Sequence, residues 1–230
     1  MGARTNYQFS DRFGINYWLT NGTQQTEAFN GFKDQLGGLV FEPRKNITWN
    51  VNYYFGQEHP DTIFYLYIPA PVPDAPTQQG IPFLPIENAP TGRLHIFDSY
   101  ATWHATPALT FALEGDYVIQ RLYKNSPPLH VDGGAAYAQY QFTKKFALAG
   151  RAEYLSDRGA LFSGLSQALK ETTLTATYRF ADRFMGRAEW RYDWSNQPFF
   201  YTSALDVLRK SQLTATLGLI WWYGGKQGPW

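Results

Sequence analysis

Charged side chains occupy every second position in several segments of this sequence, and these rows are the part of the chain that could do chemistry. In residues 184–194 the odd positions are mostly Arg, Glu or Asp, whereas the even positions are aromatic or small. Because residues i and i+2 of a strand lie about 7 Å apart on one face, such rows could interlock between neighbouring strands. Eleven charged residues are predicted to line a wall that faces water: Glu114, Asp116, Arg151, Glu153, Asp157, Glu171, Arg179, Arg187, Glu189, Arg191 and Asp193.

These charged rows allow two roles, and both stay open at this point. The charges could only brace and hydrate the wall of a lumen, or some of them could set the ion preference of a pore. Since acidic and basic residues are mixed in the rows, we expect weak charge selectivity of any pore that they line.

Catalytic and metal-binding patterns are not recognisable in the sequence. The four histidines lack the spacing of metal ligands, and His95 and His104 fall on opposite faces of one predicted strand. Gly224-Gly225-Lys226 lacks the following Ser or Thr and the upstream glycine of a phosphate-binding loop. A serine and a histidine could still converge in space to form a hydrolase, but no pair stands out. We therefore predict a protein that is not an enzyme, with no catalytic residue, no metal site and no cofactor.

The overall composition excludes some classes of protein. The chain has 230 residues, a formal net charge of +1, no cysteine and 18% aromatic residues. Near-zero net charge argues against a nucleic-acid-binding protein, which would carry a basic face. The mean hydropathy is -0.40, and no apolar run approaches the roughly twenty residues of a membrane-spanning helix. A transmembrane barrel stays open, because its strands are apolar only at every second residue.

Period-two alternation extends over most of the chain and predicts strands of about ten residues, the length that a tilted strand needs to cross a bilayer. Tight polar turns alternate with longer loops, as at the two ends of an outer-membrane barrel. We predict one all-β domain over residues 1–230, an antiparallel up-and-down transmembrane barrel with about 11–12 strands in this chain. Strands are expected to start at or near Arg4, Phe13, Lys33, Ile47, Arg93, Leu109, Gly133, Phe146, Leu169, Phe184 and Gln212.

The strand count and the N-terminus bear on the extent of the barrel. Eleven strands are an odd number, whereas bacterial single-chain barrels have an even number. The first residues also lack the hydrophobic core of a signal peptide. We therefore expect this chain to be the C-terminal portion of a larger barrel.

The apolar face of the strands could point inward, as in a soluble lipocalin-like barrel, or outward to lipid. Aromatic residues gather at strand ends, which matches the interfacial girdles of membrane barrels, and the face between them mixes Gly and Ala with Leu. The membrane arrangement is therefore favoured. The predicted aromatic girdle consists of Phe9, Phe13, Phe142, Phe146, Tyr154, Phe180, Phe184, Tyr192 and Trp194.

The longest predicted loop, residues 57–92, holds eight prolines interleaved with aromatic and aliphatic residues. So much proline excludes a central strand and favours extended segments. The loop could fold over the rim of the barrel. Alternatively it could enter the lumen and narrow it, which would place Asp61, Asp74 or Glu87 near the constriction.

Two stretches of the chain resemble a known family. The ending, from Leu213 to Trp230, reads LTATLGLIWWYGGKQGPW, and the segment that starts at Asp98 reads DSYATW, followed by TPALT and GDY. Both resemble the β-barrel porin-2 family of OmpL-like outer-membrane porins, over the later part of a full-length member. The resemblance implies a channel in the Gram-negative outer membrane, inserted by the barrel-assembly machinery. Trp230 would be the terminal aromatic residue that this machinery reads.

The sequence thus predicts an outer-membrane porin, a water-filled channel for passive diffusion of small hydrophilic solutes. The alternatives are a surface barrel that acts as an adhesin or scaffold through its loops, and a soluble ligand-binding barrel. The expected partners are outer-membrane lipid, lipopolysaccharide, the assembly machinery and the solutes, with no nucleic acid. Association of copies into a homo-oligomer stays open.

Overall fold

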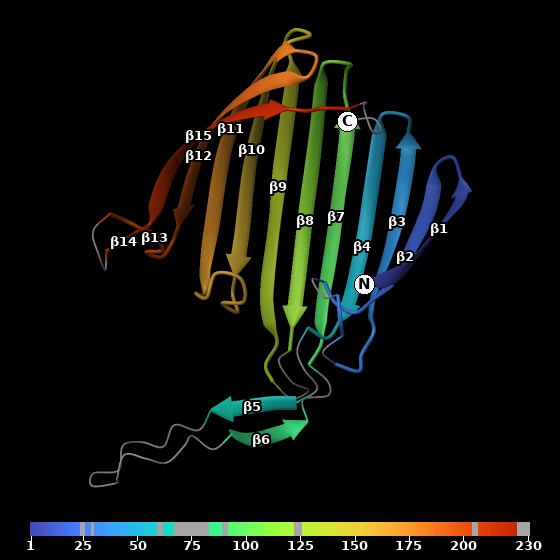
Figure 1. Cartoon of the computed structure of the whole chain (residues 1–230), viewed down its shortest axis with the longest axis vertical. Coiled ribbons are helices and arrows are strands. Elements are labelled where there is room, and N and C mark those ends of the chain that lie inside the picture. Colours follow the sequence, from blue (N-terminus) through green and yellow to red (C-terminus); the bar gives the residue numbers. More distant parts are fainter. Residues whose placement is uncertain are drawn as a thin grey trace.

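The computed structural model describes residues 1–23, 26–28, 30–58, 92–121, 126–203 and 207–224, together with the backbone of 62–66 and 83–88. Its main feature is one curved antiparallel sheet of 11 strands, in which each strand pairs with the strand of this sheet that follows it in the sequence (Figure 1). Across the sheet the strands are β1 (Gly2–Ser10), β2 (Phe13–Thr20), β3 (Asp34–Arg44), β4 (Ile47–Gly56), β7 (Leu94–His104), β8 (Leu109–Gln120), β9 (Leu129–Gln141), β10 (Phe146–Asp157), β11 (Gln167–Ala181), β12 (Phe184–Ser195) and β15 (Ser211–Trp221). The predicted all-β, up-and-down fold is confirmed.

The predicted strand starts agree closely with the observed ones. The starts at Phe13, Ile47, Leu109, Phe146 and Phe184 are those of the structure, and the largest error is at β9, which begins at Leu129 instead of near Gly133. The agreement has a local cause. In this sheet one face is apolar and the other polar, so the alternation marks each strand by itself.

Short turns and long loops lie at opposite ends of the sheet, as the sequence predicts (Figure 1). Hydroxyl side chains fix several of the short turns. In the turn between β9 and β10, Thr143 Oγ1 accepts hydrogen bonds from the backbone N–H of Lys145 at 3.2 Å and of Phe146 at 3.1 Å. Thr106 Oγ1 does the same for the N–H of Leu109 at 3.0 Å before β8. Such bonds set the strand register at the turn.

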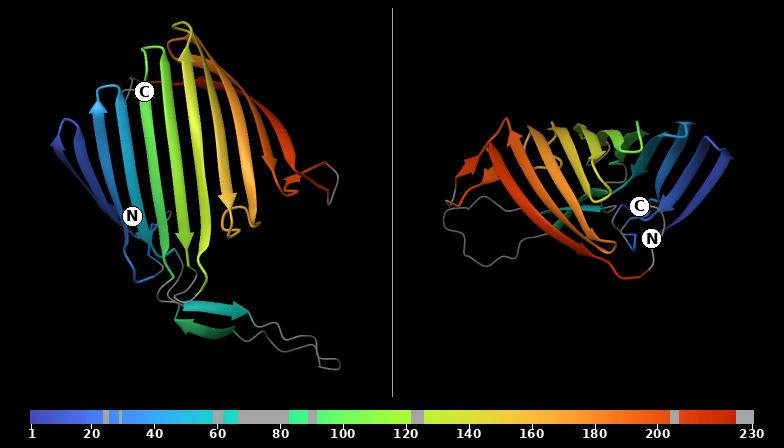
Figure 2. Two further views of the ribbon diagram at one scale, coloured as in Figure 1. Left: turned by 180° about the vertical axis from the view of Figure 1, so that it is seen from behind. Right: turned by 90° about the horizontal axis from the view of Figure 1, so that it is seen from above.

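The sheet curves into a trough, with β1 at one edge and β15 at the other (Figure 2). Two long loops contain short hairpins of their own. β5 (Thr62–Leu66) pairs with β6 (Phe83–Asn88) within the proline-rich segment, and β13 (Phe200–Tyr201) pairs with β14 (Leu208–Arg209) between β12 and β15. The predicted long loop of residues 57–92 thus contains two short strands, and neither is part of the main sheet. Pro85 is tolerated because β5 and β6 form a separate two-stranded sheet, in which both strands are edges.

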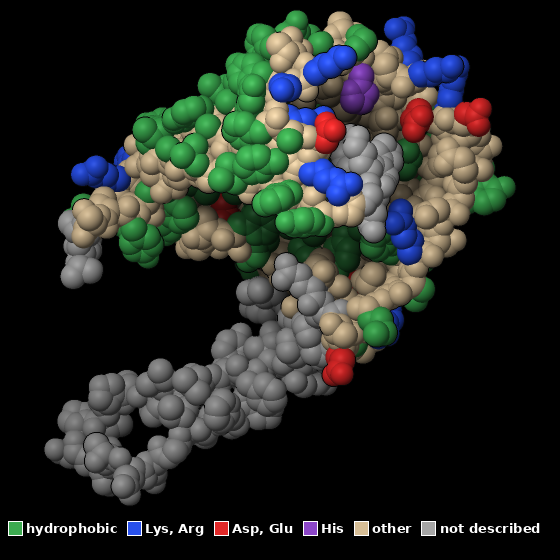
Figure 3. Space-filling view, turned by 45° about the horizontal axis from the view of Figure 1, so that its top comes forward, with side chains coloured by type: hydrophobic (Ala, Val, Ile, Leu, Met, Phe, Trp, Pro, Cys, Tyr) green, Lys and Arg blue, Asp and Glu red, His purple; other side chains and the backbone are tan. Residues whose placement is uncertain are grey.

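The outer face of the sheet is apolar and exposed. Leu174 and Trp190 lie directly opposite each other in the middle of β11 and β12, and both side chains are exposed. On β15 Leu217 is 86% exposed. Figure 3 shows hydrophobic side chains gathered in a broad patch over the C-terminal part of the sheet. An apolar band that follows every second residue of each strand suits contact with lipid. No helix in the described part of the chain has the length and apolarity needed to cross a membrane.

Three turns repeat one arrangement of aromatic rings on the outer face. Tyr178 and Phe180 meet edge to face with ring centroids 5.1 Å apart, and Phe180 stacks on Phe184 at 5.1 Å. Gly186 makes room for this cluster, because a Cβ there would lie 3.0 Å from the Phe180 ring. The same triad recurs at 7, 9 and 13 and at 140, 142 and 146. At the other end Tyr192 stacks on Trp194 at 5.4 Å.

Candidate pore wall

The charged rows lie on the concave face of the sheet. Strand register places Glu153 of β10 opposite Glu171 of β11, and Glu171 opposite Asp193 of β12. The same row continues to Ala135 on β9 and to Glu114 on β8. Glu153, Glu171 and Asp193 are half-buried or buried, whereas their outer-face neighbours Tyr154, Thr172 and Tyr192 are exposed. The structure thus brings together side chains that are far apart in the chain.

An ion-pair ladder crosses four strands in this row. Arg151 of β10 donates from Nε to the Glu171 carboxylate at 2.8 Å. Arg191 of β12 places Nη2 2.9 Å from the same carboxylate and Nε 2.8 Å from that of Asp193. The ladder ends at Gln212 of β15, which donates to Asp193 at 2.9 Å. We call Arg151, Glu171, Arg191, Asp193 and Gln212 the ladder. Glu171 and Asp193 are buried beneath the two guanidinium groups, and this pairing offsets the cost of their desolvation.

A second group on the concave face is acidic throughout. Asp98 of β7 lies opposite Asp116 of β8, and carboxylate oxygens of Asp98, Glu114 and Asp116 all lie within 4.8 Å of one another. Asn52 donates to Asp98 at 2.6 Å, and the Tyr137 hydroxyl donates to Glu114 at 2.9 Å. Within the described residues no ion pair reaches these three acids. This part of the wall therefore carries negative charge, and its oxygens are of the kind that divalent cations prefer.

Asp157 differs from its predicted role as a water-exposed wall residue. Its side chain is 0% exposed, and its carboxylate accepts the N–H groups of Leu161, Phe162 and Ser163 at 2.8, 3.0 and 2.7 Å and the Ser163 hydroxyl at 2.8 Å. The prediction is wrong because alternation gives the face of a residue, not what the next loop places over it. Asp157 holds the 158–166 loop in shape.

Asp157 is the last residue of β10, three residues beyond Tyr154 of the predicted girdle, and so outside the span that this girdle predicts for the membrane. Burial would raise the pKa of this carboxyl, but the hydrogen bonds from Ser163, Leu161 and Phe162 outweigh burial and hold the pKa below its usual value. The group is therefore ionised at neutral pH, as an acceptor of four hydrogen bonds requires.

The other predicted wall residues lie nearer the short turns. Glu189 accepts a hydrogen bond from the Thr175 hydroxyl at 3.0 Å. Arg179 and Arg187 lie on the same face and make no ion pair with any described residue. The predicted constriction residues Asp61 and Asp74 and the predicted assembly signal Trp230 lie outside the described residues, and for Glu87 only the backbone is described.

The family of the chain follows from comparison with known proteins. The family model described as Putative beta-barrel porin-2, OmpL-like, matches residues 1–221. The chain belongs to this family. The porin-2 chain is accordingly a porin-type β-barrel protein of the Gram-negative outer membrane, which confirms the resemblance and the location predicted from the sequence.

Solved structures of OmpT share the fold of this porin-2 chain. OmpT of Vibrio cholerae, folded in vitro, is 13% identical with a TM-score of 0.58 and is matched over 95% of this chain and 63% of its own length. OmpT expressed in the outer membrane is 12% identical with a TM-score of 0.57, and the match covers 95% of this chain and 64% of OmpT. The NanC porin is 11% identical with a TM-score of 0.49, over 96% of this chain and 91% of NanC. The porin-2 chain thus spans less than two thirds of the OmpT structures. No curated protein matches it.

Sequence reasoning missed several residues of the porin-2 wall. Asp98 lies two residues before Tyr100 and therefore shares one face of an alternating strand with it, opposite the face of Phe97 and Trp103. This alternation could have placed Asp98 on the polar face. The aromatic residues of β13 could not have been found in this way, because the loop that holds them has no period. Asp34, fully buried at the start of β3, accepts bonds from the Tyr54 hydroxyl at 2.7 Å and the Gln57 N–H at 2.8 Å. No pattern in the sequence marks that pairing.

Proposed function

We propose that this chain forms the wall of a water-filled channel for passive diffusion of small hydrophilic solutes, with weak charge selectivity and no catalysis. The observation that carries the proposal is the division of the sheet into an exposed apolar face and a concave face with the ladder and the acidic group. Polar side chains on a concave face can hydrate a lumen, whereas an apolar outer band can contact lipid tails.

Weak selectivity follows from the way the wall charges are paired. In the ladder, Arg151 and Arg191 compensate Glu171 and Asp193, so most of this charge is cancelled over a few ångströms. Within the part of the chain that the structure describes, no ion pair compensates the acids Asp98, Glu114 and Asp116 or the basic residues Arg179 and Arg187. The two groups act in opposite directions at different depths. Charges of both signs along one path favour neither cations nor anions strongly.

The proposal also includes closure of the barrel and its surroundings. An open sheet edge would leave backbone N–H and C=O groups without hydrogen bonds in hydrocarbon. We therefore propose that the edge strands β1 and β15 each pair with a further strand, in a complete barrel of more than the 11 strands described. By the usual orientation of such barrels, the short turns would face the periplasm and the long loops the exterior. The barrel-assembly machinery, lipopolysaccharide and further copies of the chain remain proposed partners.

Reconstitution in planar lipid bilayers tests the function. We expect stepwise conductance, and a reversal potential close to zero in a potassium chloride gradient. A barrel that inserts without conductance would favour the adhesin or scaffold hypothesis instead. A reversal potential near the Nernst value of either ion would contradict weak selectivity.

A further inference from the structure

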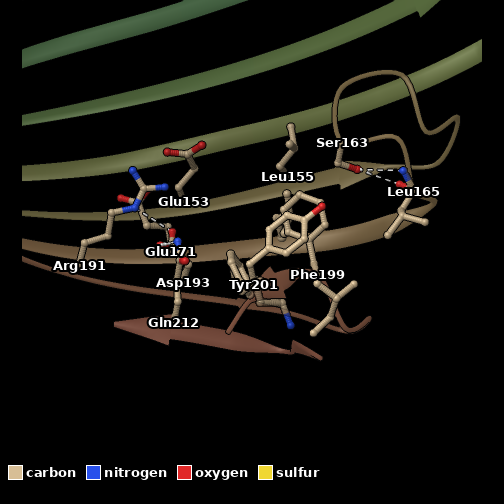
Figure 4. A pocket seen from close by; sticks show the side chains of 14 residues that line it. Glu153, Leu155, Ser163, Leu165, Glu171, Arg191, Asp193, Phe199, Tyr201 and Gln212 are labelled. Carbon is tan, nitrogen blue, oxygen red and sulfur yellow. Dashed lines mark hydrogen bonds and ion pairs between the residues drawn. The ribbon is translucent and has the colours of Figure 1, made fainter. Parts of the chain in front are cut away.

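A recess opens on the concave face at the long-loop end of the last strands. It has a volume of about 670 Å³, within the range of small-molecule sites. Its two sides differ in chemistry, as Figure 4 shows: charged side chains gather on one side and aromatic and aliphatic side chains on the other. The charged side holds Glu153, Glu171, Arg191, Asp193 and Gln212, and the apolar side holds Leu155, Leu165, Phe199, Phe200, Tyr201 and Leu208.

Most polar atoms on the charged side already have partners. The carboxylates of Glu171 and Asp193 already accept hydrogen bonds from the other ladder residues. Glu153 is different, because its side chain is 38% exposed and its nearest cation, Arg151, lies 3.8 Å away. Arg191 remains 43% exposed at its side chain. The recess therefore offers a ligand the Glu153 carboxylate as a hydrogen-bond acceptor and the Arg191 guanidinium as a donor.

The aromatic side of the recess is held in place by the β13–β14 hairpin. The Phe199 N–H donates to the Arg209 carbonyl at 2.9 Å, and the Thr202 hydroxyl donates to the Val207 carbonyl at 3.0 Å. Phe200 is buried and packs edge to face on Phe199 with centroids 5.3 Å apart. Tyr201 lines the recess yet is 90% exposed, so its ring is available for contact. Because the hairpin orders this surface in advance, binding costs little conformational entropy.

The charges of the recess decide which ligand chemistry fits. Three acids balance three bases, Lys170 and Arg191 in the lining and Arg151 beside it, so the recess has no formal net charge. An anion would meet the exposed carboxylate of Glu153, and a cation would meet the exposed guanidinium of Arg191. A purely apolar ligand would remove water from both without replacing their hydrogen bonds. A hydroxyl group satisfies both, because it donates and accepts.

We propose that this recess binds a neutral carbohydrate, which makes it a solute-recognition site at the mouth of the channel; the inference rests on the proposed function. The C–H face of a pyranose ring packs on Tyr201 and Phe199. Its hydroxyl groups donate to the Glu153 carboxylate and accept from the Arg191 guanidinium. Phe200 and the ladder residues Glu171 and Asp193 hold these groups in position and do not contact the sugar.

Isothermal titration calorimetry with maltose tests this assignment on the purified protein in lauryldimethylamine oxide, a detergent without a sugar headgroup that could compete. We expect maltose to bind, and mannitol, which has hydroxyl groups but no ring face, to bind at least tenfold more weakly. Tyr201→Ala should weaken maltose binding about fivefold through loss of ring packing, and Tyr201→Phe should restore it. Glu153→Gln should weaken it roughly tenfold through loss of a charge-assisted hydrogen bond.

The matched control for Glu153→Gln is Glu42→Gln, which removes one acid far from the recess and should leave maltose binding unchanged. Absence of maltose binding, equal binding of mannitol, or tighter binding of glutamate or lysine would overturn the proposal. An equal loss in Glu42→Gln would do so as well. Conductance is measured separately in bilayers: current without maltose binding overturns the recess alone, and maltose binding without current overturns the channel alone.

Discussion

Arg191 places one guanidinium nitrogen 2.9 Å from the carboxylate of Glu171, on the neighbouring strand. Because the same guanidinium also reaches Asp193, one exposed cation pairs with two buried acids, and Arg151 supplies the second positive charge. The charges of this wall are thus held in a fixed pattern by their own partners. A channel lined in this way presents the same electrostatic surface to every solute that passes.

Replacing the central acid of the ladder should be costly. Glu171→Gln leaves Arg151 and Arg191 without their shared carboxylate, so we expect the free energy of unfolding to fall by about 2 kcal/mol. Tryptophan fluorescence during urea unfolding from lipid vesicles measures it. Glu189→Gln is the comparison, since Glu189 accepts one hydrogen bond from Thr175. Equal losses of unfolding free energy in the two variants would show that the ladder adds no stability beyond that of a single hydrogen bond.

A charged side chain on the outer face should lower the stability of the protein in lipid. Leu174→Arg places a cation in the middle of β11 on the apolar face, and we expect a loss of about 2–4 kcal/mol of stability in lipid. Thr175→Arg puts the same residue on the concave face one position later, opposite Glu189, and should be tolerated. Unfolding in vesicles compares the two. If Thr175→Arg proved the more harmful, the assignment of the faces would be reversed.

The loop held by Asp157 should depend on pH. Its pKa is lower in the folded protein than the ordinary 3.8, so its stabilisation is complete above that value and is lost as the pH falls through the folded pKa. Nuclear magnetic resonance of the Leu161, Phe162 and Ser163 amides should show the loop intact at pH 6 and released in strong acid. Asp157→Asn should release it already at pH 6. Unchanged amide signals in that variant would contradict the role of Asp157.

The unpaired charges of the wall should tune ion preference in opposite directions. Asp116→Asn removes one of three clustered acids and should raise the ratio of chloride to potassium permeability, roughly twofold. Arg187→Gln should lower that ratio. Reversal potentials in a potassium chloride gradient report both. A shift of the same sign in the two variants would show that their charges do not face the ions.

Deletion of residues 62–89 tests whether the proline-rich segment narrows the lumen. If that segment enters the pore, single-channel conductance should rise. Unchanged conductance would instead favour a loop that folds over the rim.

The strands of this protein could be predicted because each one carries its own signal. Alternation in residues 184–194 identifies β12 and its two faces without knowledge of any neighbour. The partners of the charges could not be predicted in the same way. Arg191 meets Glu171 only because the register of β11 and β12 aligns them, and register depends on turns and on side chains of both strands.

The site at the loop end was the least accessible to sequence reasoning. The rings of Phe199, Phe200 and Tyr201 enter the recess because a short hairpin turns them toward β10 and β12, and no periodic pattern announces such a hairpin. Asp157 also shows that strand periodicity does not predict the contacts of a loop. Its position on the strand predicts contact with water, whereas the backbone of the next loop takes that place.

The three matching ring triads have a consequence for how such a protein can change over generations. Each triad clamps its own two strands at the turn, so the alignment of one hairpin does not depend on the next. A gene segment that encodes one hairpin could then be duplicated or lost while the turns of the other hairpins keep their alignment. Since barrel diameter grows with strand number, the bore of the molecule could widen or shrink in increments of two strands.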